Sequence, residues 1–275
     1  MSAMQKLIEY ELDNPGADSA PPQILTPIEK HGDIYFKRED KFKICDAIGA
    51  KARTAHYLIT DAKNRGFRGV TTAGSRTSPQ INIVATIANA MGMQCVAHTP
   101  LGKLSPELID AQNKGAIIIQ HKAGYNNVII ARSQEYASQH NYYNIPFGME
   151  CKEAVSQALM QVKDLLPNIK KIVIAVGSSM NLAGVLQGLK KKKLSIPVLG
   201  IMVGANPISR LDKYAPACWR GMVQLIKSEL KYHEEEKNNE KYGIKFDPIY
   251  EAKCLKYLQP DDLFWVIGIR KTLSS

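Results

Sequence analysis

A glycine-bearing turn lies between a strongly apolar segment and a helical segment past the middle of the chain. The sequence KIVIAVGSSMNLAG enters this turn at Gly177 and passes through Ser178, Ser179, Met180 and Asn181. Such a turn presents backbone N–H groups and hydroxyls at the N-terminus of a helix, an arrangement that binds phosphate. A plain tight connection between a strand and a helix has the same composition, so the turn alone leaves both interpretations open.

A second turn of the same character lies earlier, in the sequence TTAGSRTSPQIN. It follows a predicted strand and enters a predicted helix, and its polar residues include Ser75, Thr77, Ser78 and Gln80. Helix N-termini that carry hydroxyls also bind carboxylates. Capping of the helix by Ser78 would explain the turn equally well, so carboxylate binding and capping both stay open.

Two further features carry groups that could do chemistry. Lys51 stands between small residues in the sequence GAKAR, near the start of a predicted helix, which gives its amine open space. Tyr250 and Glu251 follow a proline turn in the sequence FDPIYEAKCL, although surface acids are common and the pair alone means little.

Several familiar motifs are missing from the chain. It has no GxGxxG after a strand, no GxxxxGK[ST], no HExxH and no GxSxG, and its six histidines are dispersed. These absences disfavour a nucleotide hydrolase, a zinc enzyme and a serine hydrolase, and we expect no metal site.

The composition indicates a globular protein that can bury a large core. Of 275 residues, 45% are hydrophobic, and 36 Lys and Arg against 26 Asp and Glu give a formal net charge of +10. This charge favours an anionic partner without identifying one.

Five dispersed cysteines without a CxxC pair fit a reducing compartment. The N-terminus does not read as a signal peptide, and no stretch is apolar enough to span a bilayer, so we expect a cytoplasmic protein without membrane association.

Alternating strands and helices must position these turns. From about residue 68 the apolar pattern predicts strands in RGVTTAG, QCVAHT, AIIIQH, KKIVIAV and PVLGIMV, with helices between them. Ser105, Pro106 and Gly115 are typical of the two ends of one such helix. The segment 233–241, HEEEKNNEK, is expected to be a solvated helix or a mobile connection. The alternation indicates an α/β fold with parallel sheets covered by helices on both faces.

In combination, the motifs resemble the pyridoxal-phosphate enzymes of fold type II, the tryptophan synthase β-subunit fold. Within it the chain is similar to the group of 1-aminocyclopropane-1-carboxylate deaminase and D-cysteine desulfhydrase. The matching motifs are TPIEK, IYFKRED, GAKAR, TTAGSRTS, VGSSMNLAG and DPIYEAK, in that group's order and across most of residues 26–255. The resemblance implies a three-layer α/β fold of two lobes with the cofactor between them. The large lobe would be residues 1–51 and 145–275, and the small inserted lobe residues 52–144.

The resemblance also implies roles for individual residues. Lys51 matches the lysine that forms the Schiff base with pyridoxal 5'-phosphate, and residues 177–181 match the cup that holds its phosphate. Glu251 matches the acid that keeps the pyridine nitrogen protonated, which makes the ring a stronger electron sink. Tyr250 matches an active-site tyrosine. The substrate carboxylate would be held by Ser75, Thr77, Ser78 and Gln80, with Ser78 also part of the catalytic group.

The chain departs from the family pattern at several positions. The usual asparagine before the lysine is Ala50, and the usual asparagine after Ser78 is Pro79, which offers neither a side-chain amide nor a backbone N–H. The cofactor's hydroxyl therefore needs another partner, for which we suggest Asn82. The expected glycine after the Tyr-Glu pair is Ala252, and the C-terminal FWVIGIRKT lacks the threonine-glycine-glycine run of the deaminases.

The first functional hypothesis is a pyridoxal-phosphate-dependent lyase or deaminase that acts at the Cα of an amino-acid substrate, with Lys51 moving the Cα proton. A second is a decarboxylase or lyase acting on an amino acid attached to a DNA base. The net charge of +10 suggests this nucleic-acid partner, and the shortened chain also looks like pyridoxal-phosphate enzymes of bacteriophages that modify their DNA bases. A third is a family member that only binds a ligand, against which the retained Lys51 and Glu251 argue. The family is usually dimeric, so we expect a homodimer.

Overall fold

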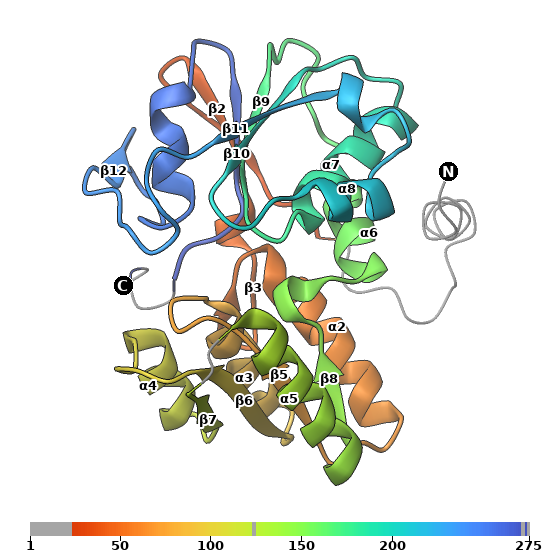
Figure 1. The fold of residues 1–275 in the computed structure, drawn as a ribbon. Coiled ribbons are helices and arrows are strands. Elements are labelled where there is room, and N and C mark those ends of the chain that lie inside the picture. Colours follow the sequence, from red (N-terminus) through yellow and green to blue (C-terminus); the bar gives the residue numbers. More distant parts are fainter. Residues whose placement is uncertain (1–23, 123–124, 271–272, 274–275) are drawn as a thin grey trace. The chain divides into compact units, whose positions relative to one another are not determined.

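The computed structural model describes residues 24–122, 125–270 and 273, and these form two compact units. The first unit contains residues 24–42 and Cys151–Ile269, and the second contains Lys43–Glu150 with residues 270 and 273. Figure 1 labels many of the helices and strands of both units. The predicted small lobe, residues 52–144, lies inside the second unit, which also includes Lys51.

The first unit is built on a six-stranded sheet in the order β1-β2-β14-β9-β10-β11. In that order the strands are Ile28–His31, Ile34–Arg38, Leu263–Val266, Ile172–Val176, Val198–Met202 and Val223–Lys227. The pair β1–β2 is antiparallel, which the sequence analysis did not predict, and the other pairs are parallel. Strands β10 and β11 extend the sheet on one side of β9, whereas β14 lies on its other side. The connections therefore change direction between β9 and β14.

Helices and short segments cover this sheet. Helix α6 (Lys152–Met160) packs against α7 (Met180–Lys191), and a Cβ on Gly184 would lie 2.4 Å from the carbonyl oxygen of Val155, so this close helix contact requires glycine. A separate buried cluster joins strand residues to Phe246 and to the 3₁₀ helix η4 (Glu251–Tyr257). The remaining elements are η1 (Glu39–Lys41), α8 (Ile208–Tyr214), η3 (Trp219–Gly221), β12 (Glu240–Lys241) and β13 (Ile244–Lys245).

The second unit is built on a parallel four-stranded sheet in the order β7-β6-β5-β8. In that order the strands are Ile117–His121, Gln94–Pro100, Gly69–Ala73 and Tyr142–Ile145. As predicted, the apolar runs of RGVTTAG, QCVAHT and AIIIQH form its strands. Because β6 and β7 lie on one side of β5 and β8 lies on the other, the connections of this sheet change direction between β5 and β8.

Four helices accompany the second sheet. They are α2 (Ala50–Asn64), α3 (Gln80–Ala90), α4 (Pro106–Asn113) and α5 (Asn126–His140), and the short β3 (Lys43–Ile44), β4 (Ala47–Ile48) and η2 (Phe147–Met149) complete the unit. The crossovers through α3 and α4 run in one direction along the sheet and the crossover through α5 returns. Right-handed crossovers therefore place α5 on the opposite face from α3 and α4. The predicted ends of α4 are confirmed, since the Ser105 side chain accepts a hydrogen bond from Leu108 N–H and Gly115 has a φ of +81°.

Two segments contain less helix than their sequences allow. The sequence ECKEAVSQALMQVKDLL, residues 150–166, has an apolar pattern that predicts one helix, but the helix ends at Met160. The residues that follow form tight turns, in which the Gln161 side chain accepts a hydrogen bond from the backbone N–H of Thr26. The acidic segment 233–241 forms no helix and joins β12 only at its last two residues. Its backbone is instead held by long-range contacts such as the hydrogen bond from Glu236 N–H to the carbonyl of Pro248 at 2.8 Å.

A pair of histidines lies in the interior of the second unit. His98 on β6 is 2% exposed, and its Nδ1 lies 3.0 Å from Nε2 of His121 on β7. The two rings are stacked with centroids 5.2 Å apart, and Tyr136 meets His98 edge-on. Burial, and then the charge of His121, lower the pKa of His98 to about 4.

We expect this pair to make the second unit sensitive to acid. The unfolded chain binds a proton at the ordinary histidine pKa of 6.5, whereas folded His98 binds one only near 4. The stabilising contribution is therefore complete above the higher value and is lost as the pH falls towards the lower one, up to ~3 kcal/mol. Thermal unfolding measured from about pH 7 to about pH 4.5 should lose stability more steeply in the wild type than in His98→Gln. Equal pH slopes for the two proteins would contradict this assignment.

Candidate functional site

In each sheet there is one pair of neighbouring parallel strands from which the chain connections lead away in opposite directions. These pairs are β9 with β14 and β5 with β8. In open α/β sheets the carboxyl ends of such a pair are the position at which ligands bind. The predicted phosphate turn follows β9, which neighbours β14, and the predicted substrate turn follows β5, which neighbours β8. The topology thus places both turns at the expected binding edge of their own sheet.

The phosphate turn, residues 177–181, begins helix α7. Ser179 is its N-cap and adopts the left-handed conformation, with a φ of +75°. The Ser179 hydroxyl is buried, and it neither caps the helix nor finds another hydrogen-bond partner within the described part of the chain. The first N–H groups of a helix lack acceptors inside the helix, and the helix dipole adds positive charge there. The turn therefore has the donors that an anionic group requires.

Gly177 allows this turn to approach its neighbours closely. A Cβ on Gly177 would lie 3.2 Å from Cε1 of Tyr250, and a Cβ on Gly204 would lie 3.1 Å from the carbonyl oxygen of Gly177. The structure thereby brings the turn together with Tyr250, although the two are far apart in sequence. A side chain at 177 would push against the tyrosine ring.

Glu251 begins η4 directly after Tyr250 and is 3% exposed. Burial raises the pKa of its carboxyl well above the ordinary value, and the nearby charges of Asp247 and Asp40 raise it further, whereas hydrogen bonds from its own N–H and that of Gly268 act in the opposite direction. Gly268 lies just beyond β14, so this carboxyl lies near the end of that strand. A buried acid of this kind favours the protonated form and can share a proton with a ring nitrogen.

Asp247 fixes the backbone that carries Tyr250. Its Oδ1 accepts hydrogen bonds from the N–H groups of Ile249 at 2.9 Å and Tyr250 at 3.1 Å. The hydroxyl of Tyr250 lies 2.7 Å from the hydroxyl of Tyr232. Sequence reasoning missed Tyr232, because it adjoins the acidic segment 233–241 and no motif marks it.

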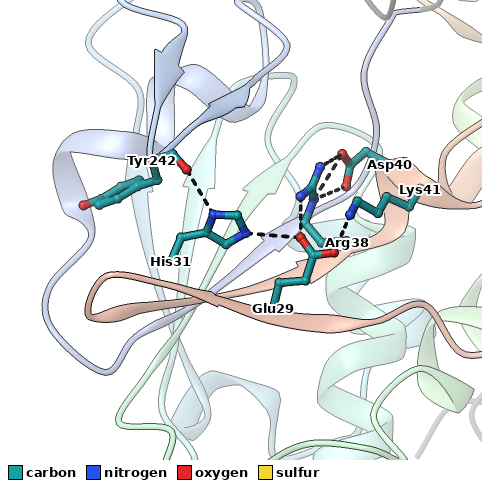
Figure 2. Close-up of polar contacts among 6 residues, drawn as sticks. All are labelled: Glu29, His31, Arg38, Asp40, Lys41 and Tyr242. Carbon is teal, nitrogen blue, oxygen red and sulfur yellow. Dashed lines mark hydrogen bonds and ion pairs between the residues drawn. The ribbon is translucent and has the colours of Figure 1, made fainter.

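An ion-pair network holds the motif IYFKRED (Figure 2). Arg38 lies between two carboxylates, with Nη1 2.7 Å from Glu29 Oε2 and Nη2 2.7 Å from Asp40 Oδ2. His31 and Lys41 also bind Glu29. Burial would raise the pKa of Glu29, but hydrogen bonds from Lys41 and His31 and the charge of Arg38 lower it to about 2. The network therefore fixes Asp40, whose charge helps to raise the pKa of the buried carboxyl of Glu251.

Lys51 is the second residue of α2, in the second unit. The helix is entered through Gly49, whose φ of +89° favours glycine, and the flanking Ala50 and Ala52 are buried. The Lys51 side chain is half-buried. A lysine that forms a covalent link to a ligand reacts through its neutral amine.

The substrate turn between β5 and α3 is tightly tied. The N–H of Ser78 donates to the carbonyl of Ser75 at 3.0 Å, and the N–H of Gln80 donates to the Ser78 hydroxyl at 3.3 Å. The buried Arg270 donates through Nη1 to the carbonyl of Thr77. This arginine comes from the C-terminal segment that lacks the deaminase threonine-glycine-glycine run, and the sequence analysis assigned it no role.

Two side chains of α3 point to different neighbours. The Nε2 of Gln80 donates to Thr72 Oγ1 at 3.0 Å and to the carbonyl of Pro146 at 2.9 Å, which holds it at the ends of β5 and β8. The Nδ2 of Asn82 instead donates to Asp110 Oδ2 on α4 at 2.6 Å. The amide nitrogen that we suggested for the cofactor's hydroxyl is therefore engaged by α4.

Other features bear on the class of site. Within the described residues, no group of three or more His, Cys, Asp and Glu side chains could hold a metal ion. A search of the same residues finds no helix with the length and apolar character to cross a membrane. Each of the five cysteines lies in the described ranges and is free.

Comparison with known families and proteins gives three results. A family model described as pyridoxal-phosphate dependent enzyme matches residues 22–229. The D-cysteine desulfhydrases of Salmonella paratyphi A and Klebsiella pneumoniae are 25% and 24% identical to this chain over 201 residues, which is 66% of its length. The chain spans 60% of the length of these curated relatives.

The third result concerns solved structures. The crystal structure of an ACC deaminase homologue matches with a TM-score of 0.79 at 22% identity and covers 99% of this chain and 97% of its own. Threonine deaminase isoform 2 from Solanum lycopersicum gives a TM-score of 0.69 at 13% identity, with 96% and 89% covered. The apo diaminopropionate ammonia lyase of Escherichia coli gives 0.62 at 13%, with 98% and 88% covered. These likenesses confirm the predicted fold class.

Proposed function

This chain belongs to the pyridoxal-phosphate dependent enzyme family, and from that premise we propose that it catalyses a lyase- or deaminase-type reaction at the Cα of an amino acid. The observation that carries the proposal is the arrangement in the first unit. There the predicted phosphate turn 177–181 packs on Tyr250, and the next residue in the chain, Glu251, is buried. The names of the similar proteins, which include a desulfhydrase, deaminases and an ammonia lyase, belong to this reaction class.

The residues present fit the cofactor of the family. The N–H groups at the start of α7, with the partnerless hydroxyl of Ser179, would hold its phosphate. Glu251 would keep a proton at the ring nitrogen of the cofactor, and Lys51 would bind the cofactor covalently through Nζ. Bound pyridoxal phosphate supplies an electron sink for the bond broken at Cα.

The other roles follow from the chemistry of the side chains. We propose that the Lys51 amine accepts and returns the proton at Cα, because it is a half-buried base. The N–H groups at the start of α3, with Ser75, Thr77 and Ser78, would bind the substrate carboxylate. The half-buried Tyr250 would donate its hydroxyl proton to the leaving group of the substrate, or to the substrate atom that is protonated in the reaction.

A second candidate keeps the cofactor and changes the substrate to an amino acid attached to a DNA base, with decarboxylation as one outcome, as in bacteriophage DNA modification. The net charge of +10 supports it, and so does the altered substrate turn, in which Pro79 is the N-cap of α3 and Arg270 binds Thr77.

We also propose the two-lobed division predicted from sequence. We further propose a homodimer, and light scattering of the purified protein tests this oligomeric state. A cytoplasmic location is supported by the free cysteines, and fractionation of the producing cell tests it.

The spectrum and substrate range of the purified protein test the proposal. We expect a yellow protein that releases ammonia, sulfide or carbon dioxide from one member of a panel of free amino acids, including D-cysteine and 1-aminocyclopropane-1-carboxylate. Turnover only with amino acids attached to DNA, and DNA binding that weakens steeply with added salt, would favour the second candidate. A colourless protein that takes up no pyridoxal phosphate would contradict both.

A further inference from the structure

A second tyrosine lies against Tyr250 in the first unit. The hydroxyls of Tyr232 and Tyr250 are 2.7 Å apart, and their rings meet edge-on with centroids 5.8 Å apart and planes at 77°. Both rings pack on the same buried cluster. A separation of 2.7 Å is typical of an O–H···O hydrogen bond, so one hydroxyl donates its proton to the other.

A buried lysine holds the backbone of Tyr232 in place. Lys253 is 3% exposed, and its Nζ donates to the carbonyl oxygens of Lys231 at 2.7 Å and Tyr232 at 3.4 Å. A buried ammonium must keep such partners, because leaving it without them is costly. Lys253 belongs to η4, the element that begins directly after Tyr250. The loop that carries Tyr232 is therefore tied to the element that carries Tyr250.

Two further contacts of Tyr250 restrict its ring and its backbone. Asp247 binds the backbone N–H of Tyr250 at 3.1 Å, and the ring packs against Gly177 of the phosphate turn. These contacts set where the ring lies but leave the hydroxyl hydrogen able to rotate. The hydrogen bond to Tyr232 acts on the hydroxyl itself.

We propose that Tyr232, anchored by Lys253, is a positioning residue that orients the hydroxyl of Tyr250. The inference rests on the proposed function, in which Tyr250 gives a proton to the substrate. With Tyr232 as donor, Tyr250 keeps its own proton for that transfer. Once the proton has moved, the negative charge left on the Tyr250 oxygen is stabilised by the same hydrogen bond from Tyr232.

Substitution of single hydroxyls tests this inference. Tyr232→Phe keeps the ring, and we expect kcat to fall roughly three- to tenfold while KM and cofactor content stay close to the wild type. Tyr250→Phe should lose at least as much. The double variant should lose no more than Tyr250→Phe, because Tyr232 acts only through Tyr250. Losses that add in the double variant would show an independent structural role and overturn the proposal. Tyr257→Phe, on the same buried cluster, is the matched control and should leave kcat unchanged.

A second measurement is independent of turnover. In protein labelled with carbon-13 at the tyrosine Cζ, the Tyr250 signal is identified by its loss in Tyr250→Phe. We expect this signal to move in Tyr232→Phe and to stay in place in Tyr257→Phe. An unmoved signal in Tyr232→Phe would overturn the pairing. If the wild type showed no turnover, the proposed function would fail, while the signal would still report on the two tyrosines.

Discussion

Lys51→Ala is expected to abolish both the covalent attachment of pyridoxal phosphate and the absorption band of the imine that it forms with the protein. The side chain of Lys51 supplies the amine that we assign to this link, and alanine has no nucleophile to replace it. Turnover should fall below detection, since the same amine is assigned the proton transfer at Cα. Absorption spectra and assays of the dialysed variant, made beside the wild type, measure both losses.

The control for this variant is Lys63→Ala. Lys63 lies in the last turn of the same helix and is exposed, so its loss removes a lysine from α2 without touching the start of the helix. We expect its spectrum and activity to match the wild type. A Lys51→Ala protein in which borohydride reduction still fixes the cofactor to the chain would exclude Lys51 as the attachment residue. Because alanine is a strong helix former, Lys51→Ala without cofactor should unfold at a temperature close to that of the cofactor-free wild type.

Glu251→Gln is expected to slow turnover by about one to two decades while cofactor binding stays largely intact. The carboxyl of Glu251 is assigned a charge-assisted hydrogen bond to the ring nitrogen, and its loss corresponds to roughly 1.5–3 kcal/mol in the transition state. Glutamine keeps the shape of the side chain but cannot give the ring nitrogen a proton. Single-turnover rates at saturating substrate, with cofactor content measured in the same samples, provide the test.

A stability measurement separates this electronic role from misfolding. Because burial raises the pKa of Glu251, its contribution to the stability of the cofactor-free protein is present below the ordinary carboxyl pKa and is lost as the pH rises through the folded pKa. Glutamine is neutral throughout, so cofactor-free Glu251→Gln should be at least as stable as the wild type at neutral pH. A variant that is less stable, or one that turns over at the wild-type rate, would contradict the assigned role.

Local signals in the sequence predicted much of the fold. Apolar runs such as IVIAV bury a whole strand, and the polar and glycine residues after them end it, so β5, β6, β7, β9 and β10 were predictable. The ends of α4 were also predictable, because capping depends on residues within one turn of the helix. In the same way, glycine and hydroxyl residues after β9 and β5 marked the two turns that we propose as binding turns.

Contacts between distant segments could not be predicted. Tyr232 reaches Tyr250 because Lys253 holds its loop, and no local periodicity encodes a lysine bound to two carbonyl oxygens. The side chain of Asn82 donates to Asp110 on α4, a pairing set by how two helices pack. Arg270 similarly binds Thr77 across most of the chain. The residue types of the site were thus visible in the sequence, whereas the residues that orient them were not.

The central claim is that Lys51 carries the cofactor. Borohydride reduction of the wild-type protein, followed by proteolysis and mass spectrometry, fixes the pyridoxyl group to the lysine that holds it and identifies that residue. We predict a single modified peptide, with the added mass on Lys51. A pyridoxyl group on any other lysine, with Lys51 unmodified, would contradict the account.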